Sequence, residues 1–410
     1  MEEEQMPEAV IVAAARSPIG RAGKGSLREL RPDVLATQIV SAALAMVPEL
    51  DPTTIDDLMM GCAQPAGEQA YNIARVTAVR LGLDGLPGTT VHRYCASSLQ
   101  TTRMAMHAIR AGEGHAFISA GVETVSRFTA GKSDGMPDTK DEVFLDAARR
   151  RVARVERGEP WSDPRDAGEW PDVYVAMGET AENVAELCKV SRQAQDEFAV
   201  RSQNLAEAAA ARGFWATDIT PVRLPDGTVV DTDDGPRKNV TLEKVAALAP
   251  AFRPNGTVTA ANCCGLNDGA AALVVLSDVR ARELGLTPLA RVVSTGVSAL
   301  SPELMGLGPV QASQAAVARA GLSMSDIDLV EMNEAFAAQV LPCVDQLGLD
   351  LDRVNVNGGA IALGHPFGST GARMATTLIH AMRERDVQFG LETMCAAGGQ
   401  GMAMVLERLS

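Results

Sequence analysis

Four separate segments carry the side chains that could do chemistry. Cys95 follows a strand-like run (TTVHRY, 89–94) and stands where a helix is predicted to begin. A thiol at a helix N-terminus faces the positive end of the helix dipole and free backbone N–H groups. That setting lowers the pKa of a thiol and favours the thiolate nucleophile. Taken alone, a cysteine could equally be a small buried apolar side chain.

The second segment is a glycine-rich loop around a histidine, Asn355–Gly371 (NVNGGAIALGHPFGSTG). Its glycines allow the backbone to approach a ligand closely, and Pro366 suits the first turn of a following helix. An imidazole at His365 could accept a proton from a thiol or polarise a carbonyl group. By itself, the loop is also compatible with a purely structural turn.

Two more segments complete the set. Cys395 opens the run CAAGGQG, in which a thiol could act as acid and base while loop N–H groups face an oxyanion. Asn333 opens NEAF, and its amide could position a water or a carbonyl group, or cap a helix. Two thiols, an imidazole and an amide on glycine-rich turns fit thioester chemistry. One thiol would carry an acyl group, and the other would move a proton at carbon.

The elements that must position these side chains follow from the apolar pattern. Helical patterns follow both Cys95 and His365, with Leu99, Met106 and Ile109 on one face of the first. Met374, Leu378 and Met382 share a face of the second. Short continuous apolar runs, which are typical of parallel strands covered on both faces, predict an α/β class. These runs are Ala9–Ala15, Ala116–Gly121, Ala271–Leu276, Ala290–Thr295 and Met402–Leu406.

A weak internal repeat relates the two halves of the chain. The marker Ile55–Leu58 (IDDL) lies before Cys95, and Ile327–Val330 (IDLV) lies at a similar distance before His365. A duplicated α/β unit would place Cys95 and His365 at equivalent corners. Coincidence is the alternative, since short apolar-acidic matches are common.

The middle of the chain, from about 128 to 255, differs in composition. It is rich in charge, Pro and Gly and holds all three Trp residues. Two helices are predicted in it, Glu179–Val190 and Ser191–Arg212, with Ser191 as the N-cap of the second and Gly213 as its stop. The region is interpreted as an inserted lid or binding domain.

Charge and composition exclude several classes. A formal net charge of −15 argues against nucleic-acid binding, which needs a basic surface. Phosphate groups would need a local basic patch, such as Arg237 and Lys238 with Lys244 and Arg253 following, although these could be solvated loop charges. Seven cysteines match neither a zinc pattern nor a disulfide framework, and no apolar run reaches membrane-spanning length. We therefore expect a cytoplasmic protein with free thiols and no membrane partner.

Eight motifs, in order along nearly the whole chain, make the sequence resemble the thiolases. They are Arg16–Gly20 (RSPIG), Gly61–Arg75, Cys95–Gln100 (CASSLQ), Met177–Asn183 (MGETAEN), Thr257–Ala272, Asn333–Phe336 (NEAF), Asn355–Arg373 and Cys395–Gly401. The resemblance implies a duplicated five-layer αβαβα fold with an inserted loop domain. Its parts would be an N-terminal half (1–127 and 256–284), the loop domain (128–255) and a C-terminal half (285–410). It also implies a homodimer or homotetramer.

The resemblance also implies roles for individual residues. Cys95 is expected to be the acylated nucleophile, and His365 the base that activates it. His365 and a water on Asn333 would form one oxyanion hole, and the backbone N–H groups of Cys95 and Ala397 a second. Cys395 would be the acid and base at the α-carbon.

Binding residues are implied in the same way. Acyl-CoA and coenzyme A would be the substrates, without a metal or redox cofactor. The loop domain, with Arg237, and the segment around Cys264 would hold coenzyme A. Met177, Met305 and Phe336 would contact the substrate, with both methionines bordering the acyl pocket.

Four positions depart from the family pattern. His92 replaces a usual Asn and is interpreted as a packing substitute; Ala397 replaces a usual Gly but keeps its N–H. Cys264 replaces a common Ser, which would weaken a polar contact to the pantetheine arm. Ala176 stands where short-chain members tend to have His, and the smaller side chain could open the pocket to longer acyl chains.

The expected activity is thiolytic cleavage of 3-ketoacyl-CoA by coenzyme A, or the reverse Claisen condensation, through a Cys95 acyl-enzyme. Three alternatives are a β-ketoacyl synthase on a related fold, a non-catalytic acyl-CoA-binding subunit, and a Cys-His-Asn hydrolase. The NEAF and CAAGGQG motifs favour a thiolase over the synthase. The acyl chain and the physiological direction stay open.

Overall fold

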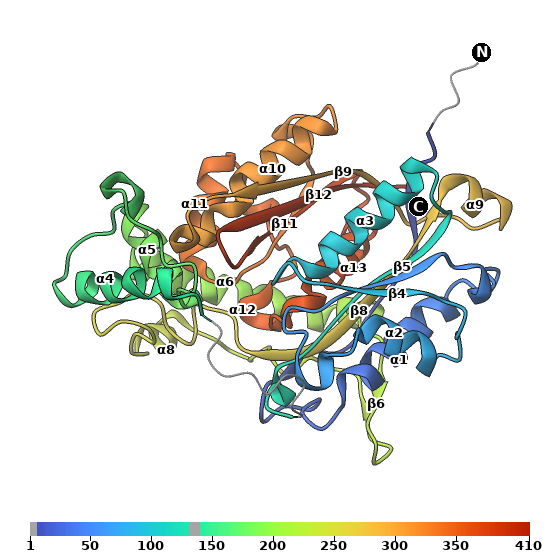
Figure 1. Ribbon diagram of the computed structural model, residues 1–410, viewed down its shortest axis with the longest axis horizontal. Coiled ribbons are helices and arrows are strands. Elements are labelled where there is room, and N and C mark those ends of the chain that lie inside the picture. The colour runs from blue at the N-terminus through green and yellow to red at the C-terminus, as the bar shows by residue number, and fades with distance from the viewer. Residues whose placement is uncertain (1–5, 131–139) are drawn as a thin grey trace.

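The computed structural model describes residues 6–130 and 140–410, which form a mixed sheet with helices on both faces (Figure 1). The strand order is β4-β3-β5-β8-β1 in one half, continued by β9-β12-β11-β10 in the other. The halves join where β1 meets β9 through the pairs Val10–Arg291 and Ile11–Ala290. A short strand, β2 (Gly20–Arg21), pairs with β8.

The two halves repeat the same order of elements. The first half runs through β1 (Ala9–Arg16), α1 (Pro32–Ala45), β3 (Asp57–Gly61), α2 (Ile73–Arg80), β4 (Gly88–Val91), α3 (Ser97–Ala111), β5 (Ala116–Thr124) and later β8 (Asn267–Ser277). The second runs through β9 (Ala290–Ala299), α10 (Gly308–Arg319), β10 (Leu329–Met332), α11 (Ala337–Leu347), α13 (Thr370–Arg385), β11 (Phe389–Ala396) and β12 (Gln400–Arg408). A single bridge between Val330 and Val354 takes the place of β4 in the second half.

The aspartates of the two sequence markers have the same role. The Asp56 carboxylate accepts hydrogen bonds from the backbone N–H groups of His115 and Ala116, where β5 begins. The Asp328 carboxylate accepts from Gln388 and Phe389, where β11 begins. The repeat is therefore a structural duplication rather than a coincidence.

Three apolar clusters separate five layers. One cluster holds Leu99 of α3 and Leu378 of α13 together with inward side chains of both half-sheets, so α3 and α13 form the central layer (Figure 1). A second joins α1 and α2 to the outer face of the first half. A third joins α10 and α11 to the outer face of the second half. The expected αβαβα arrangement is confirmed.

The five apolar runs are strands, but the expectation of parallel pairing is wrong for most of them. β1, β8, β9 and β12 pair antiparallel, whereas β5 pairs parallel with β3 and antiparallel with β8. Helices cover both faces of each half-sheet, so nearly all side chains in these runs are buried whatever the strand direction; Arg291 and Val293 of β9 are half-buried. A continuous apolar run therefore indicates a strand covered by helices on both faces, and it does not indicate parallel pairing.

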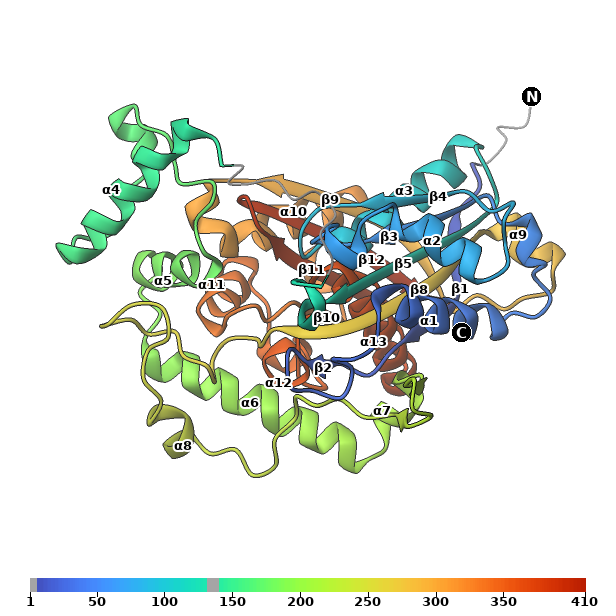
Figure 2. The same cartoon turned by 60° about the horizontal axis from the view of Figure 1, so that its bottom comes forward.

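The inserted region packs along one end of the sheet and includes α4 (Leu145–Glu156), which projects from the body in Figure 2. The predicted helices are α5 (Met177–Leu187) and α6 (Arg192–Ala211), and Ser191 caps α6 by accepting from Ala194 N–H at 3.1 Å. The remaining short elements are α7 (Phe214–Asp218), α8 (Leu242–Ala246), α9 (Asp278–Glu283), α12 (Ala360–Leu363), β6 (Val222–Arg223) and β7 (Val229–Val230). Among helices of the described residues, none is long and apolar enough to cross a membrane.

Candidate active site

Cys95 sits on a tight turn between β4 and α3. Tyr94 has φ of 46°, a left-handed conformation that costs energy for a residue with a side chain. The Ser97 hydroxyl stabilises the turn, accepting from Arg93 N–H at 2.9 Å and donating to Tyr94 O at 2.6 Å. Cys95 is partly exposed and precedes the first helical residue by two positions. Cys95 therefore lies just before α3 and not, as the sequence predicted, at its first residue.

The expected lowering of the Cys95 pKa is wrong. Burial of the sulfur raises the pKa to about 12, while the backbone N–H groups of Cys95 and Ala397 act in the opposite direction. The negative charge of Glu123 adds to the rise. Burial by distant parts of the chain raises the Cys95 pKa more than the nearby helix terminus lowers it. Before reaction, Cys95 is therefore a neutral thiol that needs a base.

His365 is held by its backbone and by both ring nitrogens. Gly364 has φ of +117°, and a Cβ there would lie 2.6 Å from Asn267 Cγ. The Asn267 side-chain oxygen accepts from His365 N–H at 3.0 Å. His365 Nδ1 lies 2.7 Å from the Thr370 hydroxyl, which donates to Pro366 O. Because that hydroxyl proton is already used, Nδ1 carries the ring proton and Nε2 is left as the acceptor.

The electrostatics keep this imidazole neutral. Burial lowers the His365 pKa to about 3, and the positive charge of Arg373 adds to the effect. The Nε2 lone pair is therefore unprotonated at physiological pH, which is the state that a proton acceptor needs.

Asn333 follows β10 and faces the histidine. Its Nδ2 lies 3.2 Å from His365 Nε2. The Asn333 Oδ1 is buried and has no hydrogen-bond partner within the described part of the chain. The next helix, α11, begins four residues later with Phe336 at its N-cap, so Asn333 does not serve as that helix cap. Its unpartnered oxygen points to a water or ligand.

The two corners meet because α3 and α13 pack closely at their N-terminal ends. The Ser98 hydroxyl accepts from Ala372 N–H at 2.9 Å. Gly371 permits this approach, since a Cβ there would lie 2.3 Å from Leu99 N. Cys95 and His365, just before the two helices, are thereby brought to the same place.

Cys395 lies near the end of β11 and is fully buried. Burial raises its pKa well above the usual range, and the neighbouring thiols of Cys95 and Cys343 raise it further. In the turn that follows, Gly398 and Gly399 have positive φ, and Gln400 accepts from Arg93 Nη1 at 2.9 Å. That contact ties the turn to the Cys95 segment and presents Ala397 N–H to the Cys95 sulfur.

Apolar side chains surround Cys395 on one side. Met305 and Phe336 belong to the same cluster as Cys395, and Met177 and Cys264 pack against it. The structure thus brings four of the five expected binding residues together beside Cys395, and the fifth, Arg237, lies in a separate groove. Phe252 also packs on Phe336, with ring centroids 6.1 Å apart.

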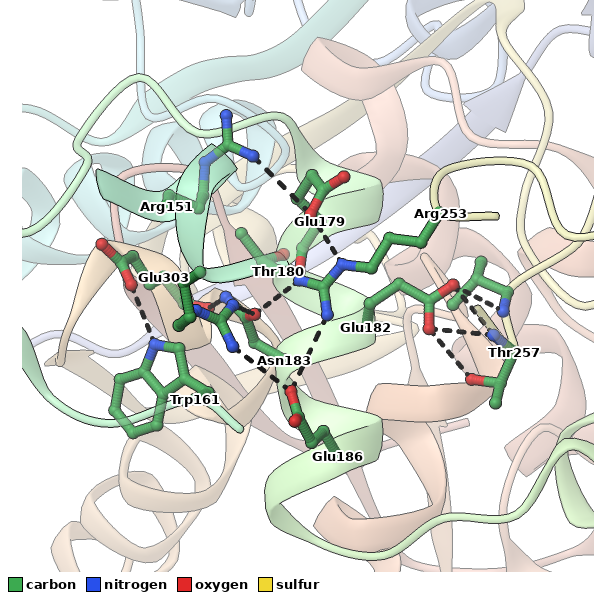
Figure 3. A network of polar contacts seen from close by, with 12 residues as sticks. Arg151, Trp161, Glu179, Thr180, Glu182, Asn183, Glu186, Arg253, Thr257 and Glu303 are labelled. Atoms are coloured by element: carbon green, nitrogen blue, oxygen red, sulfur yellow. Dashed lines mark hydrogen bonds and ion pairs between the residues drawn. The ribbon is translucent and has the colours of Figure 1, made fainter. Parts of the chain in front are cut away.

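A polar network holds the two methionine segments together (Figure 3). Asn183 on α5 donates to Glu303 O at 3.0 Å, two residues before Met305. The Glu303 carboxylate accepts from Trp161 Nε1 and from Asp172 N–H, both at 2.8 Å. Glu303 therefore fastens the inserted region to the C-terminal half beside the apolar cluster.

A basic groove leads toward the histidine. It has a volume of about 570 Å³, and its lining includes Cys263 and Gly364. Its basic side chains are Arg21, Lys24, Arg237, Lys238 and Lys244. Arg253, named with these residues in the sequence, lies elsewhere: it pairs with Glu179 at 2.8 Å and borders a separate hollow.

Several residues of the site have no clear signal in the sequence. Thr370, Asn267 and Gln339 make specific contacts through ordinary buried polar side chains, which one sequence does not distinguish from core residues. Glu123 is fully buried and accepts from Ala63 and Gly368 N–H groups, both at 2.8 Å. His92, interpreted as a packing residue, stacks edge-on against Tyr94 at 4.5 Å.

Comparison with known proteins identifies the class. The family model "Thiolase, N-terminal domain" matches residues 9–279, and "Thiolase, C-terminal domain" matches 286–408. The chain therefore belongs to the thiolase family, and the resemblance seen in the motifs is confirmed. It is a thiolase enzyme, an acyltransferase that acts on coenzyme A thioesters.

Individual relatives agree over the full length. The chain is 43% identical over 413 residues to the 3-oxoadipyl-CoA/3-oxo-5,6-dehydrosuberyl-CoA thiolase of Escherichia coli K12, with 98% of this chain and 100% of that protein covered. It has the same identity and coverage over 414 residues to a 3-ketoacyl-CoA thiolase of Serratia proteamaculans. The fold matches Bacillus anthracis acetyl-CoA acetyltransferase (TM-score 0.84, 36% identity, 98% and 99% coverage). It also matches human mitochondrial 3-ketoacyl-CoA thiolase (TM-score 0.85, 33% identity, 99% and 100% coverage).

Proposed function

We propose that this thiolase cleaves 3-ketoacyl-CoA with coenzyme A, or runs the reverse condensation, through an acyl-enzyme on Cys95. The observation that carries the proposal is the setting of Cys95: a residue that is partly exposed as a whole, with two backbone N–H groups directed at its buried sulfur. The corner that holds the neutral His365 lies against it. This is the arrangement that acyl transfer to a thiol requires.

The first step joins the Cys95 sulfur to the 3-keto carbon. His365 Nε2 takes the thiol proton as the carbon–sulfur bond forms, because a free thiolate is unfavourable at this buried sulfur. The keto oxygen becomes an oxyanion that receives backbone N–H donors from Cys95 and Ala397. His365 and a water bound to Asn333 are proposed to donate hydrogen bonds to the thioester oxygen of the acetyl-CoA portion of the substrate.

The second step breaks the carbon–carbon bond. The bonding electrons move to the acetyl-CoA portion as an enolate, and Cys395 donates its proton to the α-carbon. Incoming coenzyme A gives its thiol proton to the Cys395 thiolate and takes the acyl group from Cys95, and His365 returns a proton to the Cys95 sulfur as the thioester bond to it breaks. These steps use coenzyme A only as a substrate and require no metal or redox cofactor.

The basic groove is the proposed coenzyme A site. Its cations, including Arg237, could pair with the phosphates of the nucleotide end. Its lining also includes Cys263 and Gly364, the chain neighbours of Cys264 and His365. A bound pantetheine arm would follow this path from the phosphates to the thiols.

The acyl chain is proposed to be uncharged. Met177, Met305 and Phe336 surround the chain side of Cys395 with apolar surface, where an unpaired carboxylate would be costly. Arg253 and Arg151 of the neighbouring network already pair with Glu179. The packing therefore supports simple 3-ketoacyl chains over the dicarboxylic chain named for the Escherichia coli relative.

Thiolysis rates test this proposal directly. We expect kcat/KM for 3-ketohexanoyl-CoA to exceed that for 3-oxoadipyl-CoA by about 100-fold or more, since burying an unpaired charge costs several kcal/mol. A preference for 3-oxoadipyl-CoA would contradict an uncharged chain. Absence of coenzyme A-dependent cleavage of any 3-ketoacyl-CoA would contradict the function itself. Activity with acyl carrier protein in place of coenzyme A would favour a synthase-like enzyme.

The wider organisation is also a proposal. A three-part division at 128, 256 and 285, a homodimer or homotetramer, and a cytoplasmic location stay predictions. Strand β4 is the last strand of the sheet, so one of its two edges pairs with no other strand of the described residues. An exposed strand edge of this kind supports association between copies.

A further inference from the structure

A buried carboxamide lies between two groups of the proposed mechanism. Gln339 is on α11 and is fully buried. Its side chain satisfies both ends in one orientation, in which Nε2 donates to Asn333 O at 3.1 Å and Oε1 accepts from Val340 N–H at 3.0 Å. The carboxamide is thereby fixed against the backbone of Asn333.

The same nitrogen faces the second thiol. The carboxamide atom nearest Cys395 Sγ is 3.6 Å from it, and in this orientation that atom is Nε2 of Gln339. A primary amide has two N–H bonds, so one can bind Asn333 O while the other points to the sulfur. A hydrogen bond to an ionised acceptor is stronger than one to a neutral acceptor, so this contact favours the Cys395 thiolate.

Cys395 is otherwise in a setting that resists ionisation. Burial raises its pKa, and the thiols of Cys95 and Cys343 raise it further. The Cys264 thiol also lies near, since Cys395 contributes to the raised pKa of Cys264. Its own backbone N–H acts in the opposite direction. A neutral amide donor adds to that effect without placing a cation next to Cys95.

The packing around Gln339 preserves its position. A Cβ at Gly306 would lie 2.5 Å from Gln339 Cβ, so a glycine there leaves room for the glutamine. Gly306 O also accepts from Cys343 Sγ at 3.3 Å. The Gln339 side chain is therefore confined between its own helix, α11, and the segment that carries Met305.

We propose that Gln339 is a positioning residue for the acid and base step, stabilising the Cys395 thiolate and holding Asn333. In cleavage, the Cys395 proton passes to the α-carbon of the acetyl-CoA enolate, and the sulfur keeps the bonding electrons as a thiolate. In condensation, that thiolate removes the same proton. The inference rests on the proposed function, but it concerns the α-carbon step and not the acylation of Cys95.

Two rates on each variant separate these steps. Transfer of the acetyl group between acetyl-CoA and labelled coenzyme A reports on Cys95, and exchange of α-hydrogens of acetyl-CoA with D2O reports on Cys395. We expect Gln339→Met and Gln339→Leu to slow α-hydrogen exchange by about tenfold or more, the effect of one lost hydrogen bond to a charged group. Acetyl transfer should change by less than about threefold, well below that loss. The pH profile of α-hydrogen exchange should shift to higher pH.

Gln195→Met is the matched control, because Gln195 is another buried glutamine, bonded to Thr257 Oγ1 at 2.9 Å and outside the proposed mechanism. It should leave the ratio of the two rates and the pH profile unchanged. Retained acetyl transfer in either Gln339 variant shows that the variant is folded. Equal slowing of both rates, or an unshifted pH profile, would overturn the role of Gln339. Absence of acetyl transfer in the wild-type enzyme would instead overturn the proposed function.

Discussion

The corner before α3 and the corner before α13 occupy equivalent places in the two halves, yet they present their side chains differently. The first holds Cys95 on a strained turn, with Tyr94 at φ of 46°, and leaves this residue partly exposed although its sulfur is buried. The second buries His365, with 1% of its surface exposed, behind Gly364 at φ of +117°. The duplicated framework fixes where the two groups meet, and local backbone conformation decides how far each of the two residues is buried.

The ends of the equivalent strands differ as well. β11 carries Cys395 near its end, whereas Val122 lies at the matching place in β5, five residues after the pairs Leu329–Gly390 and Asp57–Phe117. The N-terminal half thus supplies the nucleophile. The C-terminal half supplies the proposed proton carriers, and this division can be tested by changing one half at a time.

Removing the imidazole of the second corner should have the largest effect. Because Cys95 has a pKa of about 12, it needs a base, and His365→Ala should lower kcat for thiolysis by about 10²–10⁴-fold. Steady-state rates and circular dichroism would measure activity and folding together. A folded variant with near-normal kcat would show that the second corner does not activate the first.

The neutral state of His365 should also appear in the pH dependence of stability. Its pKa is about 3 in the folded protein and the ordinary value is 6.5, so below pH 6.5 the unfolded chain binds a proton that the folded chain does not. This group therefore makes the protein less stable as pH falls toward 3, and it has no effect above 6.5.

Comparison with His365→Asn isolates that contribution. From pH 6 to pH 5, wild-type stability should fall by about 1 kcal/mol more than that of the variant, as measured by urea unfolding. Parallel losses in the two proteins would mean that the second corner holds a histidine with an ordinary pKa.

Thr370 should matter less than the imidazole that it orients. Thr370→Val removes the acceptor for the Nδ1 proton, so the ring loses its fixed tautomer, and we expect kcat to fall by about tenfold. Thr370→Ser keeps the hydroxyl and should retain most activity. Equal activity of the Val and Ser variants would exclude a role in holding the tautomer.

The smallest effects should fall on the paired aspartates and should match between halves. Asp56→Ala and Asp328→Ala each remove a carboxylate that accepts two backbone N–H groups at a strand start. Each should lower the free energy of unfolding by about 1 kcal/mol, and the double variant by the sum. A large difference between them in denaturant unfolding would show that the two halves do not depend on these contacts equally.

Much of the fold could be predicted from the sequence. The apolar runs identified strands such as β1 and β12, and the markers at Asp56 and Asp328 identified the duplication. Strand direction could not be predicted, because helices bury both faces of the sheet and remove the alternation that distinguishes the cases.

The candidate site shows a similar limit. Cys95, His365 and Cys395 stood out because they lie at glycine-rich turns or helix starts. The sign of the Cys95 pKa could not be inferred, since it depends on burial by segments far away in the chain. Thr370 and Gln339 act through single contacts, and a lone buried threonine or glutamine has no distinguishing pattern in one sequence.

The central claim is that the first corner forms the acyl-enzyme while the second corner provides its base. Its most direct test is mass spectrometry of the enzyme after brief incubation with acetyl-CoA and proteolysis at low pH. We predict one acetyl group on the peptide that contains Cys95 in the wild-type enzyme, none in Cys95→Ala, and much slower labelling in His365→Ala. Acetylation of Cys395 in the wild-type enzyme, with Cys95 unmodified, would contradict the account.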